Sequence, residues 1–268
     1  MKRAEPAPAK LNLALHVRGR LPDGRHAIET VFAFCTDGDR VECEPADTIT
    51  LETTGPFAGD LGGPDDNLVL RAARALAQRA GVESGAAIKL VKNLPVASGI
   101  GGGSADAAAT LRLLTAQWGT DPGHASAVAP ALGADVPACL LSLTARGNGA
   151  GDRLQRFADP RVAGSPILLV NPLKPVSTGE VFARWDGIDR GPLDDWRDGR
   201  NDLAPAARSL VPEIGDILEW LEGRDGVGLS RMSGSGATCF ALFNDETARD
   251  QAAAACPADW WHLASFLR

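Results

Sequence analysis

Hydrophobic and polar residues alternate in some segments of the chain and recur at helical spacing in others. Alternation with a period of two predicts strands at Leu11–Val17, Ala27–Phe34, Asp39–Glu44, Thr48–Thr53 and Ala86–Lys92. Helical spacing predicts a helix over 67–80, with Asp65 or Asp66 as its N-cap and Gly81 at its end. Two further helices are predicted, one with Ala107, Leu111, Leu114 and Trp118 on a single face, and one over His124–Leu132 that ends at Gly133.

The second half of the chain repeats this mixture. Strands are predicted at Pro166–Asn171, Val227–Met232, Thr238–Phe243 and Trp260–Leu267, and helices at Ser177–Trp185, Glu213–Leu221 and Thr247–Ala255. The glycine-rich, polar stretch Arg146–Gly151 predicts a linker. Because strands and helices alternate in clusters rather than as regular βαβ units, we expect an α+β fold with two halves, 1–150 and 151–268.

Composition and charge narrow the classes of function. The net charge of −7 argues against a partner that is a nucleic acid or an anionic membrane, and the apolar runs are too short to span a bilayer. No signal peptide is visible, and five scattered cysteines without metal-binding spacing predict free thiols in a reducing cytoplasm. Residues 1–26 nevertheless hold six basic side chains against two acidic ones. This local excess suits either a phosphorylated small molecule or a solvated basic terminus.

The most unusual stretch is PVASGIGGGSADAAA, from Pro95 to Ala109, which places four glycines within five residues at the start of a predicted helix. Backbone N–H groups at such a turn, together with the positive end of the helix dipole, form a cradle for anions such as phosphate. A Walker loop is excluded because no lysine follows Gly103, and a dinucleotide fingerprint is weak because Ser104 stands where its third glycine belongs. The plain alternative is a glycine-rich turn with Ser104 as an ordinary N-cap.

The glycine stretch resembles the phosphate loop of the galactokinase, homoserine, mevalonate and phosphomevalonate (GHMP) kinases. Three further segments agree in order with one branch of that superfamily, the 4-diphosphocytidyl-2-C-methyl-D-erythritol kinases. PAKLNL with LPDGRH is similar to the opening motif of that branch, LGADVP to its catalytic-aspartate segment, and SGSGAT to the third glycine motif of the superfamily. The resemblance implies a two-domain fold, with an N-terminal ribosomal-protein-S5-like domain and a C-terminal ferredoxin-like α/β domain.

The resemblance also implies an activity, namely phosphorylation of the 2-hydroxyl of 4-diphosphocytidyl-2-C-methyl-D-erythritol with ATP and Mg²⁺. Asp135 would accept the proton of the attacking hydroxyl, and Lys10 would face Asp135 and stabilise the phosphoryl group in transfer. By residue type and position alone, Lys10 is a surface lysine and Asp135 a helix N-cap. The ATP phosphates would be held by the loop residues Pro95, Val96, Ala97, Ser98, Gly99, Ile100, Gly101, Gly102, Gly103, Ser104 and Ala105.

The substrate would be held by Asn12, Arg25, His26, Lys92, Thr178 and Phe182. Phe182 would stack on the cytosine ring, and Lys92 can reach either the cytidyl group or the phosphates. Arg25 stands where the family usually has a tyrosine, so we expect its planar guanidinium to stack on the cytosine opposite Phe182. The alternatives are a solvent-exposed Arg25, a surface His26 and a core Phe182.

Asp106 fits the resemblance least well. A carboxylate at the start of that helix repels phosphate unless a metal lies between them, and a favourable charge at a helix N-terminus explains Asp106 equally well. It is therefore not counted among the site residues. Three rival functions remain: another GHMP kinase, a catalytically silent nucleotide-binding module and an NAD-dependent oxidoreductase. PAKLNL with PDGRH argues against the first, the presence of Lys10 and Asp135 against the second, and the frame of the glycines against the third.

Overall fold

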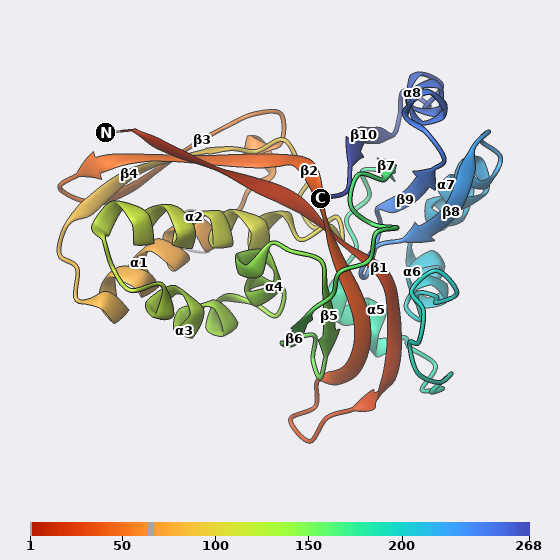
Figure 1. The fold of residues 1–268 in the computed structure, drawn as a ribbon, viewed down its shortest axis with the longest axis horizontal. Helices are drawn as coiled ribbons and strands as arrows, with labels where there is room; N and C mark the ends of the chain where they lie inside the picture. The colour runs from red at the N-terminus through yellow and green to blue at the C-terminus, as the bar shows by residue number, and fades with distance from the viewer. Residues whose placement is uncertain (1, 64–66) are drawn as a thin grey trace. The chain divides into compact units, whose positions relative to one another are not determined.

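The computed structural model describes residues 2–63 and 67–268 of the chain, which form two compact units of mixed strands and helices (Figure 1). Unit 1 takes its residues from 1–9, 37–96 and 101–142, and unit 2 from 10–36, 97–100 and 143–268. Strands β1 (Arg3–Arg20) and β2 (His26–Ala46) contribute to both units, because each is long enough to run from one into the other. The units therefore interleave along the sequence and do not coincide with the expected halves 1–150 and 151–268.

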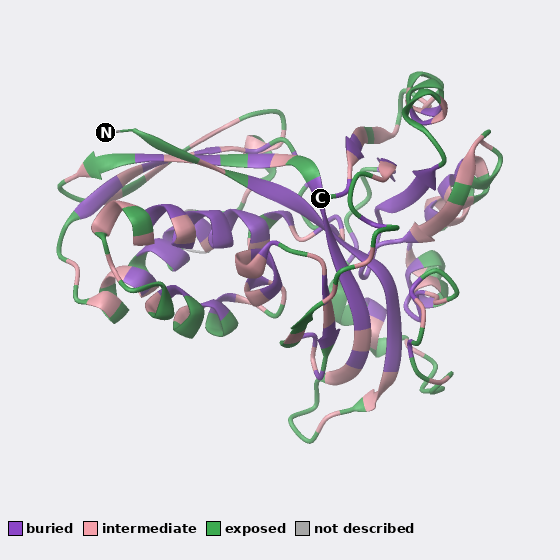
Figure 2. Ribbon diagram, in the orientation of Figure 1, coloured by how far each residue is buried: buried purple, intermediate pink, exposed green. Residues whose placement is uncertain are grey.

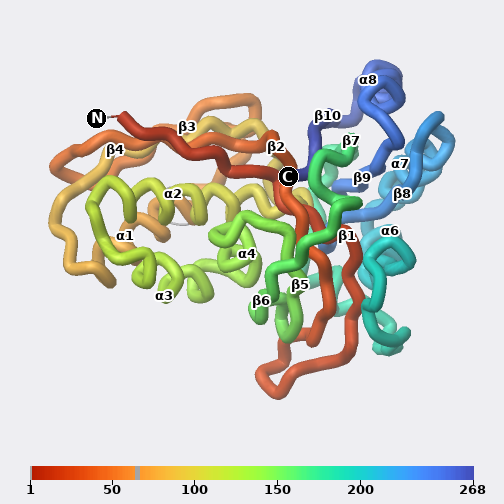
Figure 3. The backbone as a smooth tube through the Cα atoms, in the orientation of Figure 1, coloured from red at the N-terminus to blue at the C-terminus, as the bar shows by residue number. Residues whose placement is uncertain are grey.

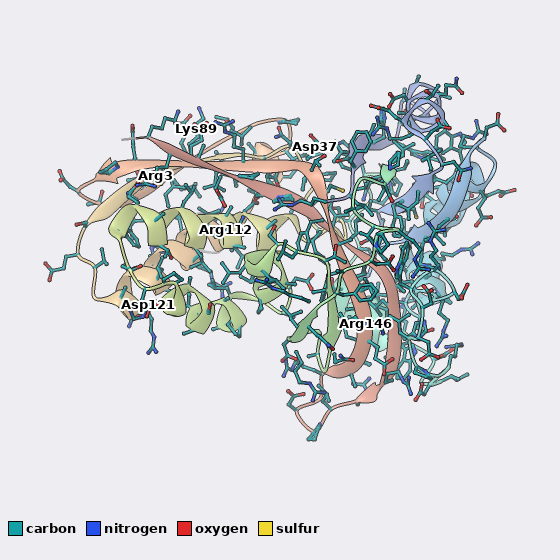
Figure 4. The ribbon with its side chains drawn as sticks, in the orientation of Figure 1. Arg3, Asp37, Lys89, Arg112, Asp121 and Arg146 are labelled. Atoms are coloured by element: carbon teal, nitrogen blue, oxygen red, sulfur yellow. The ribbon has the colours of Figure 1, made fainter. Side chains whose placement is uncertain are left out.

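Unit 1 packs helices against a small sheet. Strand β4 (Gly85–Val91) pairs antiparallel with residues 40–46 of β2 and parallel with β3 (Ile49–Thr54). Four helices complete the unit: α1 (Leu68–Ala80), α2 (Gly102–Trp118), α3 (Pro122–Leu132) and α4 (Val136–Leu141). Figure 2 shows α2 largely buried, and Arg112 on this helix (labelled in Figure 4) donates to Glu5, Pro6 and the Cys139 carbonyl. Arg112 thereby fastens α2 to the start of β1 and to α4.

Helix α1 illustrates how local sequence sets these boundaries. Asn67 accepts a hydrogen bond from the Val69 N–H at 2.9 Å and begins the helix, while Gly81 ends it in the left-handed conformation (φ 66°). The predicted caps Asp65 and Asp66 lie outside the described residues. The apolar side of α1, which includes Val69 and Leu76, is buried.

Unit 2 contains a second sheet and its own hydrophobic core. The strands follow the order β10-β7-β9-β8, all antiparallel: β7 (Pro166–Asn171), β8 (Val227–Met232), β9 (Cys239–Phe243) and β10 (Trp261–Phe266). Its helices are α5 (Thr178–Ala183), α6 (Ala204–Leu210), α7 (Glu213–Glu222) and α8 (Glu246–Ala254). The core joins this sheet to β1 and α7 through residues such as Leu15, Leu168 and Ile217.

Two predictions about the backbone are wrong. Residues 27–34 and 39–44 belong to one continuous strand, β2, whose course along the chain can be followed in Figure 3, and Gly38 allows this strand to pass close to β1. A Cβ at Gly38 would meet the backbone of Ala7, Pro8 and Ala9. The predicted linker at 146–151 is a hairpin: β5 (Ala145–Asn148) pairs with β6 (Arg153–Arg156) through a turn in which Gly149 and Gly151 have positive φ.

Among the described residues, no helix combines the length and the apolar character needed to cross a membrane.

Candidate active site

In unit 2, β1 carries Lys10 and Asn12 on the same face, two residues apart. The Lys10 ammonium donates to Asn12 Oδ1 at 2.9 Å and lies 5.5 Å from the centre of the Phe32 ring. The Asn12 amide in turn donates to Thr30 Oγ1 at 2.8 Å. Alternation along a strand places residues i and i+2 side by side, which explains how the PAKLN motif brings a cation and an amide together. Lys10 is buried, so this residue is not the surface lysine that its position alone suggested.

The loop between β8 and β9 packs on the same region. Ser233 Oγ accepts a hydrogen bond from the Asn12 N–H at 3.2 Å and donates to the Gly99 carbonyl at 3.1 Å. Gly99 has φ 79°, and a Cβ there would lie 2.5 Å from the Gly236 carbonyl oxygen. The Thr238 N–H donates to the Ser98 carbonyl at 3.1 Å. The third glycine motif therefore holds residues 98 and 99 of the glycine stretch through the Ser233 hydroxyl and a backbone hydrogen bond, at an approach too close for a Cβ at Gly99.

Five of the six expected substrate residues lie in unit 2. Thr178 at the start of α5 shares a hydrogen bond with Ser235 at 2.9 Å, while Asn12 belongs to the network on β1. His26 stacks on Phe182, with ring centroids 4.8 Å apart, and meets Trp185 edge-on at 5.6 Å. Burial, reinforced by the charge of Arg20, lowers the pKa of His26. The imidazole is therefore neutral at pH 7 and can serve as both donor and acceptor to a polar ring.

Trp185 is a residue that the sequence reasoning missed. Its indole nitrogen and His26 Nε2 are both buried without a hydrogen-bond partner among the described residues. Phe182 lies on α5 and Trp185 lies two residues beyond its end, and the spacing of three between them is the signal that could have indicated their proximity.

Arg25 lies apart from this aromatic cluster. Its guanidinium is half exposed and pairs with Asp23 at 2.8 Å and Asp152 at 3.4 Å. This placement favours the alternative in which Arg25 faces solvent, and His26 is the residue that stacks on Phe182.

In unit 1, the glycine stretch leads directly into α2. Gly101 is the N-cap residue, in the left-handed conformation (φ 62°), and as a glycine it has no side chain to cap the helix. The backbone N–H groups of the first turn lie at the positive end of a 17-residue helix, a position that suits an anion. Ser104 is in this first turn, and a Cβ added to Gly133 would lie 4.0 Å from Ser104 Oγ. These features fit a phosphate group of ATP.

Asp135 follows Gly133 and occupies the N-cap position of α4. Its backbone is helical (φ −87°, ψ −13°), and its side chain makes no capping hydrogen bond to α4. The proximity of Gly133 to Ser104 brings the Asp135 segment next to the start of α2. Asp135 thus has the position of a helix cap without the capping bond.

Lys92 is placed differently from our expectation. It is 1% exposed, and its ammonium donates to Asp106 at 2.9 Å and to Asp39. Because both carboxylates engage it in the interior of unit 1, this placement favours a structural role for Lys92 over contact with the substrate. Asp39 and Asp106 were not expected to meet Lys92. The four-residue spacing between Gly102 and Asp106 does predict that Gly102 and Asp106 lie on one face of α2.

Comparison with known proteins identifies the family of the chain. Residues 67–142 match the family model of the GHMP kinase N-terminal domain, and residues 187–261 match that of the GHMP kinase C-terminal domain. The chain is 52% identical over 281 residues to 4-diphosphocytidyl-2-C-methyl-D-erythritol kinase of Rhizorhabdus wittichii, covering 100% of this chain and 96% of that protein. It is 50% identical to the corresponding kinase of Sphingopyxis alaskensis, covering 97% of this chain and 96% of that one.

Solved structures extend the likeness to the fold. A crystal structure of 4-(cytidine 5'-diphospho)-2C-methyl-D-erythritol kinase matches with a TM-score of 0.84 and 34% identity, over 100% of this chain and 99% of that chain. Homoserine kinase from Cytophaga hutchinsonii matches with a TM-score of 0.73 at 17% identity, over 99% of this chain and 95% of that chain, which shows a shared fold. The expected two-domain α+β kinase fold is therefore confirmed.

Proposed function

The chain belongs to the 4-diphosphocytidyl-2-C-methyl-D-erythritol kinase family of the GHMP kinases, and from this premise we propose how its residues perform that reaction. The enzyme transfers the γ-phosphoryl group of ATP to the 2-hydroxyl of 4-diphosphocytidyl-2-C-methyl-D-erythritol, in the non-mevalonate route to isoprenoid precursors. The observation that carries this proposal is the 52% sequence identity to the Rhizorhabdus wittichii kinase along the whole chain. The hydrogen bonds that join Lys10, Asn12 and Ser233 of the third glycine motif support it.

In our proposal, the first turn of α2 binds the ATP phosphates through backbone N–H groups, with the loop from Pro95 to Ala105 around them. Asp135 orients the attacking hydroxyl and accepts its proton as the new O–P bond forms and the bond to the ADP oxygen breaks. Lys10 stabilises the negative charge of the group in transfer, and its bond to Asn12 holds the ammonium in place. The products are ADP and the 2-phosphate, and the proton passes from Asp135 to solvent.

The substrate base is assigned to the aromatic cluster of unit 2. Phe182 offers a ring face, and His26 offers neutral ring nitrogens for hydrogen bonds to cytosine. Thr178 and Asn12 offer polar groups to the rest of the substrate. Because His26 lies on Phe182 here, we propose that the two rings separate when the base is bound.

Mg²⁺ is part of the proposal because it neutralises phosphate charge in reactions of this type. The described residues hold no cluster of three or more His, Cys, Asp or Glu side chains suited to a metal ion. When bound with the nucleotide, the ion would supply charge neutralisation at the phosphates. A cytoplasmic location is also proposed, and five cysteines that form no disulfide are compatible with it.

A coupled assay of ADP release tests the function. The purified protein is offered ATP and Mg²⁺ with one acceptor at a time: 4-diphosphocytidyl-2-C-methyl-D-erythritol, homoserine or mevalonate. We expect ADP only with the cytidylyl acceptor. Release with homoserine or mevalonate would assign another GHMP specificity, and no release with any acceptor would indicate a silent nucleotide-binding protein.

A further inference from the structure

Asp106, on the second turn of α2, faces the interior of unit 1 and belongs to a buried cluster of three charged side chains. Lys92 Nζ donates to Asp106 Oδ2 at 2.9 Å and also to Asp39. The side chains of Lys92, Asp39 and Asp106 are 1%, 0% and 3% exposed. Two carboxylates thus share one ammonium where water cannot reach them, and the cluster carries a net negative charge unless one carboxylate takes up a proton.

The two carboxylates differ in their hydrogen bonds. Asp39 Oδ1 accepts from the backbone N–H groups of Asn93 at 2.5 Å and Leu94 at 2.8 Å, and its Oδ2 accepts from Lys92, so both of its oxygens have a donor. Asp106 Oδ1 is buried with no partner among the described residues. An ionised Asp106 would therefore leave charge on an oxygen without a donor, whereas the acid form can donate a hydrogen bond to Asp39.

The surroundings of Asp106 act in the same direction. Burial is the largest effect and raises the pKa of Asp106 to about 7, with Asp39 adding to the rise and Lys92 opposing it. Burial opposes the charge of Lys92, yet the two carboxylates outweigh this effect and raise the pKa of the ammonium. The buried residues of the other helices in unit 1 are apolar, apart from the thiol of Cys139 on α4. Lys92 on the β4 side and Asp39 on β2 are thus the charged groups that face Asp106.

The cluster lies directly below the first turn of α2. A Cβ added to Gly102 would lie 2.9 Å from Lys92 Nζ, so the backbone of this turn packs closely against the ammonium. Asp106 is four residues further along, a rise of about 6 Å. A negative charge in this cluster therefore acts at short range on whatever anion the first turn of α2 binds.

We propose that Asp106 is a positioning residue of the nucleotide site that works in its protonated form, so that the cluster beneath the phosphate cradle is neutral when ATP binds. This inference rests on the proposed function. In the neutral cluster, Lys92 and Asp39 hold the start of α2 in place without opposing the phosphates. Loss of the Asp106 proton leaves one uncompensated negative charge beneath them.

The sign of the pH effect follows directly. Asp106 is neutral below its raised pKa and ionised above it, so nucleotide affinity declines as the pH rises through about 7. One charge at about 10 Å in a partly buried setting weakens the binding of a polyanion by roughly three- to tenfold. The change should raise the KM for ATP and leave kcat nearly unaltered, because Asp106 does not touch the reacting atoms.

The first experiment measures the proton without any nucleotide. The carbon-13 signal of the Asp106 carboxyl is assigned by comparing wild-type protein with Asp106→Asn and is followed from pH 4 to pH 9. We expect a midpoint near pH 7. A midpoint in the ordinary range of an aspartate overturns the proposal, whatever the protein binds.

The second experiment measures ATP dissociation constants by calorimetry between pH 6 and 8.5. Asp106→Asn is neutral at every pH, so the ratio of wild-type to variant dissociation constants should rise three- to tenfold across this range. ATP itself titrates equally in both samples and cancels from the ratio. In Asp39→Asn, Asp106 is the only carboxylate left for Lys92, so the same pH dependence should disappear. Exposed Asp216→Asn on α7 is the matched control and should follow the wild-type profile.

The outcomes separate the two claims. A raised midpoint together with a ratio that does not change with pH refutes the coupling to the nucleotide. If the wild-type protein fails to bind ATP at every pH, both the proposed function and this inference are refuted. A raised midpoint of the Asp106 carboxyl in that case would show that the protonation of Asp106 was assigned correctly and the nucleotide site was not. If Asp106→Asn has a low melting temperature, the pH dependence of ATP binding by Asp39→Asn still tests the proposal, because this variant also changes the charge of the cluster.

Discussion

Gly99 offers the sharpest test of how the glycine stretch is held, because Gly99→Ala adds a single methyl group. Its φ of 79° is unfavourable for any residue with a Cβ, which costs about 1–2 kcal/mol. The new Cβ would also lie 2.5 Å from the Gly236 oxygen and 2.7 Å from the Ser233 oxygen. Both are backbone atoms that cannot rotate away, so overpacking adds about 1–3 kcal/mol.

Gly119 at the end of α2 is the matched control. It has a similar φ of 65°, and a Cβ there would meet nothing within 4 Å. Gly119→Ala therefore has the backbone cost alone, and we expect its free energy of unfolding to fall by about 1–2 kcal/mol. For Gly99→Ala we expect a loss of about 2–5 kcal/mol, or a local shift of the glycine loop with a raised KM for ATP.

Urea unfolding of both variants, with the KM for ATP measured in parallel, distinguishes the two costs. Equal stability of Gly99→Ala and Gly119→Ala, with an unchanged KM for ATP, would refute the close packing between the glycine stretch and the third glycine motif.

The remaining predictions concern the reaction itself. Asp135→Asn should lower kcat by about two to four decades while ATP binding persists, and wild-type turnover in a folded variant would reduce Asp135 to a helix cap. Lys10→Met should lower kcat more than it raises KM, because the ammonium acts mainly on the transition state; steady-state kinetics decides, and a pure KM effect would make Lys10 a binding residue. Arg25→Ala should leave the KM for the cytidylyl substrate within about threefold, since its partners are Asp23 and Asp152, whereas Phe182→Ala should raise that KM by about tenfold or more. The reverse order of these two effects would show that Arg25 stacks on the base.

Local signals in the sequence predicted most elements. Gly81 ends α1, Gly133 follows α3, and β7 and β8 have the predicted boundaries, because capping and alternation are decided by neighbouring residues. The opening motif singled out Lys10 and Asn12, but nothing in it predicted their hydrogen bond or the bond from the Asn12 N–H to Ser233.

Long-range contacts explain the failures. The sequence analysis left residues 35–38 between two strands, yet β2 continues through them, and Asp39 is satisfied by Lys92 and by backbone N–H groups of 93 and 94. The role of Lys92 could not be predicted for the same reason, because its partners Asp39 and Asp106 are distant in the sequence. The side of α2 on which Asp106 lies follows from packing, which the motif does not contain.

The position of the transferred phosphate tests the central claim most directly. After turnover with 4-diphosphocytidyl-2-C-methyl-D-erythritol, ATP and Mg²⁺, the proton-coupled phosphorus-31 spectrum of the isolated product is recorded. Carbon 2 bears a methyl group and no hydrogen, so a phosphate on its hydroxyl gives a monoester signal without three-bond coupling to a proton. We predict this uncoupled signal beside the unchanged diphosphate signals, and a signal at least about a hundredfold weaker when Asp135→Asn is used for the same short reaction time. A monoester signal split by carbinol protons, or ADP formation without any new monoester, would contradict the account.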